Sequence, residues 1–180
     1  MKIIYEVGDM LTTPNLYCVQ GCNAQGAMGS GIAKTIRDVY PIVFQEYRET
    51  YLSDGLNLGD LVVVAVPEAT YKGINYPQRV MINAITQEFA GNDGVRYVSY
   101  DGIARAIEGI VRFIDDMEGK NLPWDEPPEV SFPLIGAGLA RGDWHVIARL
   151  IETLSTNFQP RVYVQTQAEL DAIMELLKNS

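Results

Sequence analysis

The sequence predicts a three-layer α/β/α fold built on a mixed, largely parallel sheet of about six strands. Three observations lead to this prediction. Short apolar runs alternate with amphipathic stretches along the chain, some of the runs are continuous and rich in β-branched residues, and two glycine-rich segments directly follow such runs. Continuous apolar runs are typical of strands that are covered on both faces, as they are in parallel sheets.

The expected elements follow from the periodicity of the apolar residues. Strands are predicted over residues 3–7, 16–20, 61–66, 80–85, 130–135 and 161–165. Helices are predicted over residues 31–40, after Pro41, over 99–117 and over the stretch that holds residues 146–154. Thr166 and Glu169 have the spacing of a capping box and predict a final helix. Residues 119–129 contain three prolines and are expected to form a surface loop.

Composition and charge limit the classes of ligand. The chain has 180 residues, of which 47% are hydrophobic, and is expected to form one domain with a full core. Its net charge of −9 disfavours a polynucleotide partner, because nucleic acids are normally held by clustered lysine and arginine. An acidic protein can still bind a small phosphate ester when neutral backbone N–H groups make the contacts.

The sequence predicts no metal site, no cofactor and no membrane partner. Cys18 and Cys22 are the only cysteines and His145 is the only histidine, which is too few ligands for zinc, so two buried thiols are expected. The first residues lack the apolar core and cleavage site of a signal peptide, and no apolar run approaches the roughly 20 residues that span a bilayer. We therefore expect a cytoplasmic protein.

Two glycine-rich segments, residues 22–33 and 133–140, carry the strongest functional signal. Glycine lets a ligand approach the main chain closely, and a loop that leads into a helix N-terminus presents free N–H groups that suit phosphate. Two such loops at one edge of a sheet would hold a diphosphate between them. The spacing, GxxGxG from Gly26 to Gly31 and GxGxxxG from Gly136 to Gly142, fits neither a Rossmann fingerprint nor a P-loop.

Residues 7–10, 22–33 and 135–139 resemble the corresponding motifs of a macro domain, in the same order along the chain. More narrowly, residues 28–33, the Tyr40-Pro41 pair and residues 142–144 are similar to the branch of ADP-ribose-1″-phosphate phosphatases. The resemblance implies one macro domain over residues 1–180. It also implies a hydrolase that binds ADP-ribose and converts ADP-ribose-1″-phosphate to ADP-ribose and phosphate.

The same resemblance implies roles for individual residues. Asp9 would accept a hydrogen bond from the adenine amino group, Met10 would back the ring, and Asn23 would contact the distal ribose. The two glycine-rich segments would enclose the diphosphate, and Gln165 would border adenine. The expected ligand contacts are Asp9, Met10, Asn23, Gln25, Met28, Gly29, Ser30, Gly31, Ile32, Ala33, Ile135, Gly136, Ala137, Gly138, Leu139, Ala140 and Gln165.

Catalysis is expected to involve Asn23, which would orient a water molecule, and Asp143, which would exchange protons. Structural roles compete with both: Asn23 could bond its own loop, and Asp143 stands where a helix N-cap is expected. Arg141 is either a surface charge or a contact for a terminal phosphate. Tyr97 and Tyr100 either pack in the interior or close over the cleft.

Other outcomes for a macro domain are release of ADP-ribose from modified protein or nucleic acid, and binding without catalysis. Relatives that reverse glutamate-linked ADP-ribosylation use a lysine and an aspartate. Tyr97 and Ala140 stand near those positions here, and neither can supply an amine or a carboxylate. ADP-ribosylated macromolecules remain candidate partners, although the acidic surface disfavours nucleic acid. Asn83, a polar residue within an apolar strand, is expected to be paired inside the protein.

Overall fold

The structure is a computed structural model, and it describes residues 1–89, 91, 95–119, 126–138 and 140–178. Its main sheet has six strands in the order β1-β8-β7-β2-β6-β3. The strands of the main sheet are β1 (Ile4–Val7), β2 (Tyr17–Asn23), β3 (Leu61–Val66), β6 (Arg79–Gln87), β7 (Glu129–Phe132) and β8 (Gln159–Val164). Neighbouring strands are parallel throughout, except that the edge strand β3 runs antiparallel to β6. The predicted fold class is confirmed.

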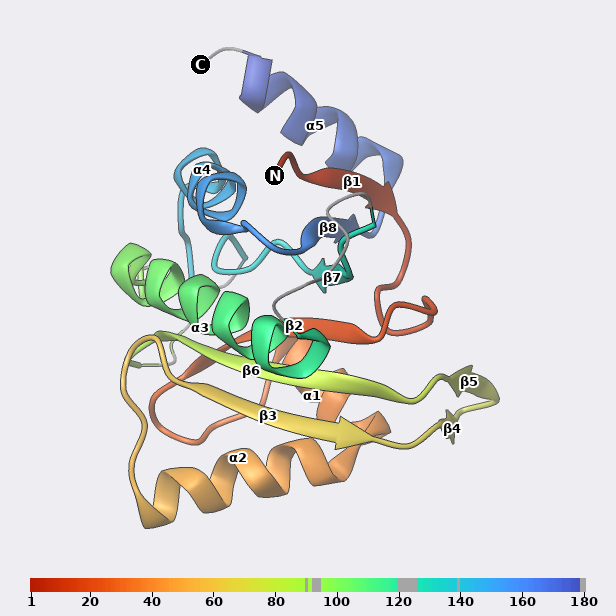
Figure 1. The fold of residues 1–180 in the computed structure, drawn as a ribbon, viewed down its shortest axis with the longest axis vertical. Helices are drawn as coiled ribbons and strands as arrows, with labels where there is room; N and C mark the ends of the chain where they lie inside the picture. The colour runs from red at the N-terminus through yellow and green to blue at the C-terminus, as the bar shows by residue number, and fades with distance from the viewer. Residues whose placement is uncertain (90, 92–94, 120–125, 139, 179–180) are drawn as a thin grey trace.

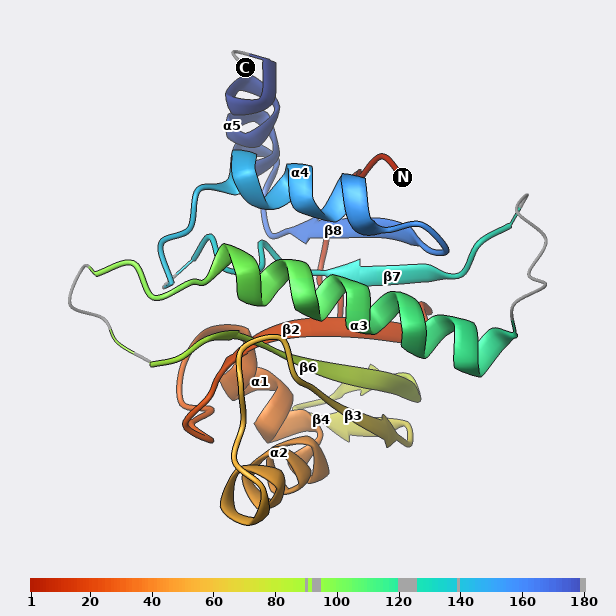
Figure 2. The same ribbon diagram turned by 60° about the vertical axis from the view of Figure 1, so that its left-hand side comes forward.

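Helices cover both faces of this sheet (Figures 1 and 2). The helices are α1 (Gly31–Val39), α2 (Pro41–Ser53), α3 (Tyr100–Glu118), α4 (Trp144–Leu154) and α5 (Gln167–Lys178). Helices α1 and α2 pack on one face, and α3, α4 and α5 contribute to the core on the other.

The alternation of side chains along the central strands divides the core into two layers. In β6, Met81 and Ile85 lie in the core beneath α1 and α2, whereas Ile82 and Ala84 lie in the core beneath α3 and α4. A strand buried on both faces has no polar side to place toward water, which is why its sequence reads as a continuous apolar run. Asn83 is fully buried in this strand, and its Oδ1 accepts a hydrogen bond of 2.6 Å from Gln20 Nε2, as the sequence predicted.

Two local features differ from the predictions. Strand β7 ends at Phe132 rather than at residue 135, because Pro133 has no N–H to continue the ladder. A short hairpin, β4 (Ala69–Tyr71) and β5 (Ile74–Tyr76), was not predicted. Lys72 and Gly73 join its strands with φ angles of 50° and 78°, as in the tight turns that suit hairpins.

The expected loop over residues 119–129 falls largely outside the described residues. None of the helices formed by the described residues is both long and apolar enough to cross a bilayer.

Four parallel strands deliver the predicted site residues to one edge of the sheet. Because β1, β8, β7 and β2 are adjacent and parallel, the segments after them leave on the same side (Figure 2). Asp9 follows β1, Gln165 follows β8, and the two glycine-rich segments follow β7 and β2. The spatial order of the strands therefore sets the order of these segments along the edge.

Candidate functional site

Two adjoining cavities open at this edge of the sheet, with volumes of about 540 Å³ and 420 Å³. Both are lined by Ile32, Pro133 and Leu134, so together they form one elongated cleft. The first cavity lies at the ends of β1 and β8, and the second at the ends of β7, β2 and β6.

The first cavity is lined by a tight turn and by the start of α5. Its lining residues are Gly8, Asp9, Met10, Ile32, Pro133, Leu134, Tyr163, Val164, Gln165 and Glu169. The Oδ1 atom of Asp9 accepts a hydrogen bond of 2.9 Å from the backbone N–H of Leu11, which fixes the carboxylate at the cavity. Met10 is only 2% exposed and forms part of the wall. The described lining residues carry two charges, the carboxylates of Asp9 and Glu169, so this cavity favours a ligand that presents hydrogen-bond donors.

The predicted capping box, Thr166 and Glu169, fixes the part of this cavity that is formed by the turn between β8 and α5. Glu169 Oε2 accepts hydrogen bonds from the backbone N–H groups of Gln165 (2.8 Å) and Thr166 (3.3 Å). In return, Thr166 Oγ1 accepts from the N–H of Glu169 at 3.2 Å. These bonds fix the turn between β8 and α5, and with it the position of Gln165.

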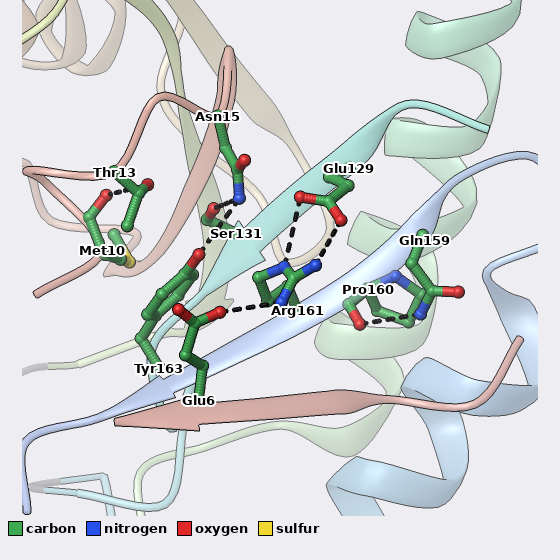
Figure 3. A network of polar contacts seen from close by, with 10 residues as sticks. All are labelled: Glu6, Met10, Thr13, Asn15, Glu129, Ser131, Gln159, Pro160, Arg161 and Tyr163. Atoms are coloured by element: carbon green, nitrogen blue, oxygen red, sulfur yellow. Dashed lines mark hydrogen bonds and ion pairs between the residues drawn. The ribbon is translucent and has the colours of Figure 1, made fainter. Parts of the chain in front are cut away.

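A polar network ties the strands beneath the first cavity to one another (Figure 3). Asn15 Nδ2 donates to Ser131 Oγ (3.0 Å) and to the hydroxyl of Tyr163 (3.2 Å), whose side chain lines the cavity. Nearby, the guanidinium of Arg161 in β8 binds Glu6 of β1 and Glu129 of β7. The contacts of Arg161 join the three parallel strands β1, β8 and β7 to one another.

The second cavity is formed mainly by the two glycine-rich segments. Its lining residues are Gly21, Cys22, Asn23, Ala27, Gly29, Ser30, Gly31, Ile32, Ala33, Thr86, Gln87, Gly91, Pro133, Leu134, Ile135, Gly136, Gly138 and Ala140. None of these described residues carries a charge. The donors that these described residues offer to an anion are therefore neutral.

Asn23 shapes the first glycine-rich segment. Its Oδ1 accepts hydrogen bonds from the backbone N–H groups of Gln25 (3.0 Å) and Ala27 (3.2 Å), and its Nδ2 donates to the carbonyl of Ala27 at 2.7 Å. The buried hydroxyl of Tyr47 donates to the carbonyl of Asn23 at 2.6 Å. The side chain therefore lines the cavity and also holds the loop around it, so the structural role considered for it is present.

The start of α1 faces the second cavity. The N-cap residue Ser30 makes no side-chain capping bond, which leaves the first-turn N–H groups without that partner. Gly31, Ile32 and Ala33 of this first turn line the cavity. A helix N-terminus carries partial positive charge and unpaired N–H donors, so this wall suits phosphate oxygens.

The second glycine-rich segment folds back on itself through main-chain hydrogen bonds. Gly136 has a φ of 73°, and its carbonyl accepts from the N–H of Gly142 at 2.7 Å. The carbonyl of Ala140 accepts from the N–H groups of Tyr97 (3.0 Å) and Val98 (3.2 Å). At Gly138, a Cβ atom would meet nothing within 4 Å, so the main chain there faces open space.

The structure brings most of the predicted ligand residues into one cleft. The predicted residues that line it are Asp9, Met10, Asn23, Gly29, Ser30, Gly31, Ile32, Ala33, Ile135, Gly136, Gly138, Ala140 and Gln165. Gln25 is exposed, Met28 is buried against α1 and α2, and Ala137 is not part of either lining. Leu139 lies outside the described residues.

Asp143 is the N-cap of α4. Its Oδ1 accepts a hydrogen bond of 2.9 Å from the backbone N–H of His145, and its own N–H donates to the hydroxyl of Tyr100 at 3.0 Å. Asp143 is exposed and lies outside both linings, as does Arg141. Tyr97 packs closely on Gly91, where a Cβ atom would collide with the ring and hydroxyl of the tyrosine.

Sequence reasoning missed the contribution of β6. Thr86 and Gln87 end this strand and line the second cavity, and Thr86 is only 1% exposed. A Cβ atom on Gly21 would approach Thr86 Oγ1 to 2.8 Å, so glycine is required between the two strands. The sequence signal that could have identified Thr86 and Gln87 is that they directly follow the predicted strand 80–85, at the edge of the sheet where the glycine-rich segments begin.

Both thiols are buried, as predicted. Burial raises the pKa of Cys18 and of Cys22, so both stay protonated at neutral pH and are poor nucleophiles. Within the described part of the chain, histidine, cysteine and carboxylate side chains form no group of three that could hold a metal ion.

Comparisons with known proteins agree with this geometry. A model of the macro domain family matches residues 19–151. The uncharacterized 17.5 kDa protein in the tk-vs intergenic region of Enterobacteria phage T4 is 24% identical over 162 residues, which span 88% of this chain and 94% of the phage protein.

Solved structures of similar fold include the macrodomain of Mycobacterium tuberculosis DarG, with a TM-score of 0.71 and 21% identity over 91% of this chain and 98% of that one. Thermosipho africanus DarTG in complex with ADP-ribose has a TM-score of 0.71 and 17% identity, over 90% of this chain and 41% of that one. An Oceanobacillus iheyensis macrodomain mutant with ADPR has a TM-score of 0.67 and 16% identity, over 98% and 91%. The family model covers well over half of the sequence, and the chain therefore belongs to the macro domain family.

Proposed function

We propose that this chain binds ADP-ribose in the cleft at the carboxyl ends of its parallel strands. The observation that carries the proposal is that the two glycine-rich segments, at least 100 residues apart in sequence, meet across one cavity with no charged side chain among its described residues. The first cavity adjoins it and presents Asp9 beside the buried Met10. Two proteins of similar fold solved with ADP-ribose support the choice of this ligand.

In this arrangement, adenine occupies the first cavity, where its exocyclic amino group donates to Asp9. The diphosphate lies between the α1 N-terminus and the segment around Gly138. The distal ribose then points toward Asn23 and Thr86. A hydrogen bond from a backbone N–H to a charged oxygen contributes about 1.5–3 kcal/mol. Three or four such bonds support micromolar binding, about −8 kcal/mol, after the cost of ordering the ligand.

For the reaction, we propose slow hydrolysis of ADP-ribose-1″-phosphate to ADP-ribose and phosphate. Support comes from the similarity of residues 28–33 to the phosphatase branch and from the neutral N–H donors that would stabilise the transferring group. We assign to Asn23 the role of orienting water; in support, it lines the second cavity and its Nδ2 carries a second N–H beside the one bonded to Ala27. We assign Asp143 to helix capping rather than to proton transfer, since its carboxylate is engaged at the α4 N-terminus.

Binding without catalysis is the second candidate function, and a specific observation favours it. The described residues of the second cavity include no carboxylate, histidine, lysine or arginine, and its one thiol, Cys22, stays protonated. Such a lining can hold a diphosphate but offers no obvious general acid or base.

One experiment separates these functions. Calorimetry with ADP-ribose tests binding, and release of inorganic phosphate from ADP-ribose-1″-phosphate tests catalysis by the wild type, Asn23→Ala and Asp143→Ala. Turnover that falls in Asn23→Ala and persists in Asp143→Ala supports the phosphatase with our assignments. Binding without release of phosphate, or of ADP-ribose from a modified protein or oligonucleotide, supports a reader. Absence of ADP-ribose binding overturns both.

A further inference from the structure

Arg79, the first residue of β6, is 2% exposed and is the largest fully buried side chain among the described residues. All five of its guanidinium N–H donors have an acceptor. The acceptors are the carbonyls of Pro77 (3.4 Å from Nε), Met10 (2.9 Å from Nη1), Leu11 (2.7 Å from Nη2) and Thr13 (3.0 Å from Nη2), and the Sγ atom of Cys18 (2.7 Å from Nη1). A buried arginine is normally paired with a carboxylate, whereas these acceptors are all neutral.

Three of the five acceptors belong to a single segment, the chain between β1 and β2. This segment carries Asp9 and Met10, which line the first cavity. Residues 9–13 also bond locally: the N–H of Leu11 donates to Asp9 Oδ1 at 2.9 Å. Thr13 Oγ1 donates to the carbonyl of Met10 at 3.0 Å (Figure 3). Asn15, later in the segment, is tied to Ser131 and Tyr163. Arg79 supplies the long-range contact that holds the carbonyls of Met10, Leu11 and Thr13 at once.

We propose that Arg79 is a positioning residue that sets the base preference of the cleft through this segment. Arg79 lines neither cavity, so its effect on the ligand is indirect. It donates to the carbonyls of Met10 and Leu11, and the N–H of Leu11 in turn donates to the carboxylate of Asp9. The inference rests on the proposed function, because base preference is defined only if the first cavity receives a nucleotide base.

Arginine is required by this geometry, and lysine cannot replace it. The planar guanidinium directs five donors outward, whereas an ammonium group has three donors at one point. In Arg79→Lys, at least two of the five acceptors lose their bond to residue 79, and in Arg79→Met all five do. The carbonyls of Met10 and Pro77 keep other donors, Thr13 Oγ1 and the Tyr40 hydroxyl, whereas those of Leu11 and Thr13 lose the donor that Arg79 gives them. Buried carbonyls without a donor are unfavourable, so we expect the segment to rearrange and Asp9 to lose its place.

The test compares ADP-ribose with inosine diphosphate ribose, in which a keto oxygen replaces the amino group that Asp9 would accept from. In the wild type, we expect ADP-ribose to bind at least about tenfold more tightly, as befits a hydrogen bond to a charged group. In Arg79→Lys and Arg79→Met, the ratio should fall below about threefold, through weaker binding of ADP-ribose. Arg105→Met is the control: Arg105 lies on α3, pairs with Asp101 rather than with this segment, and lines neither cavity, so the ratio should persist. Folded Arg79 variants that keep the wild-type ratio overturn the proposal.

Hydrogen exchange provides a measurement that does not depend on the ligand. The N–H groups of Leu11 and Thr12 both bond to Asp9. In the free wild-type protein, these two amides should exchange as slowly as amides within β6. In Arg79→Lys, they should exchange at least about tenfold faster than in the wild type. If neither Arg79 variant folds, the wild-type exchange rates alone still test the proposal. Exchange of the Leu11 and Thr12 amides at the rate of an open loop would show that the segment is not anchored and would overturn the proposal. If the wild type binds no ADP-ribose, the proposed function fails, whereas the exchange data still report whether Arg79 fixes the segment.

Discussion

Gly138→Glu is the sharpest test of the proposed diphosphate site, because the structure separates its effect on the ligand from its effect on the fold. A Cβ atom at Gly138 would meet nothing within 4 Å, and its φ is not in the left-handed region, so a side chain is accommodated without strain. The free energy of unfolding should change by less than about 0.5 kcal/mol. The new carboxylate, however, extends into the second cavity, which Gly138 lines.

The expected loss of affinity follows from simple electrostatics. A carboxylate about 5 Å from one phosphate charge is repelled by about 3 kcal/mol at an effective dielectric constant near 20, which corresponds to roughly a hundredfold weaker binding. The cavity is open to solvent, so screening reduces this value, and we expect a loss of between about tenfold and a hundredfold.

Calorimetry with ADP-ribose measures this loss, and two variants serve as controls. Gly138→Gln has nearly the same volume without the charge and should weaken binding less, by an amount that reports steric exclusion alone. Gly29→Glu places a carboxylate in the opposite segment, where a Cβ atom also meets nothing within 4 Å, and should reproduce the effect. An affinity of Gly138→Glu within threefold of the wild type would refute the convergence of the two segments on a diphosphate.

Three further predictions concern stability and the assignment of Asp143. Gly136→Ala should lower the free energy of unfolding by about 2–4 kcal/mol in urea titrations, because its φ is 73° and a Cβ atom would lie 2.7 Å from Val98 Cγ2; a loss below about 0.5 kcal/mol would contradict this. Asp143→Ala should lower the free energy of unfolding by about 1 kcal/mol through loss of the α4 N-cap, and it should leave the affinity for ADP-ribose unchanged. A drop in turnover at unchanged affinity would contradict this assignment and make Asp143 catalytic. Burial raises the pKa of Tyr5 to about 12, and the unfolded chain ionises near 10, so stability should fall as pH rises from 10 toward 12; unfolding midpoints that stay constant over this range would contradict it.

Part of the fold could be predicted from the sequence because the central strands are buried on both faces. Residues 80–85 lie within β6 and read as a continuous apolar run for that reason. Residues 61–66 read the same way, but the expectation that they are covered on both faces is wrong: β3 is an edge strand that buries Val62, Val64 and Val66 and leaves Val63 and Ala65 exposed. Because the apolar run hid this alternation, neither the edge position of β3 nor its antiparallel direction could be predicted. The β4–β5 hairpin was missed because its strands have three residues each, too short for a periodic signal.

The candidate site was predictable in outline, because parallel strands place the segments that follow them at one edge. What each glycine does there could not be read from the sequence. Gly29 and Gly138 face open space, whereas a side chain at Gly26 would meet the ring of Tyr51 at 2.7 Å and one at Gly136 would meet Val98. The first pair borders open space in the cavity, and the second pair allows the close packing of the loops. Only the packing of distant residues distinguishes these roles.

The absence of charge among the described residues of the second cavity also explains how an acidic protein can bind an anion. With a net charge of −9, a site built from lysine and arginine would draw those cations into surface ion pairs, as Lys34 does with Asp38 and Arg161 does with Glu6 and Glu129. Backbone N–H groups have fixed positions and form no such pairs, so they remain available to a ligand. The cost is that every donor depends on the conformation of its loop. For this reason Asn23, Tyr47 and Arg79, which hold loops in place, matter to the site as much as the atoms that would touch the ligand.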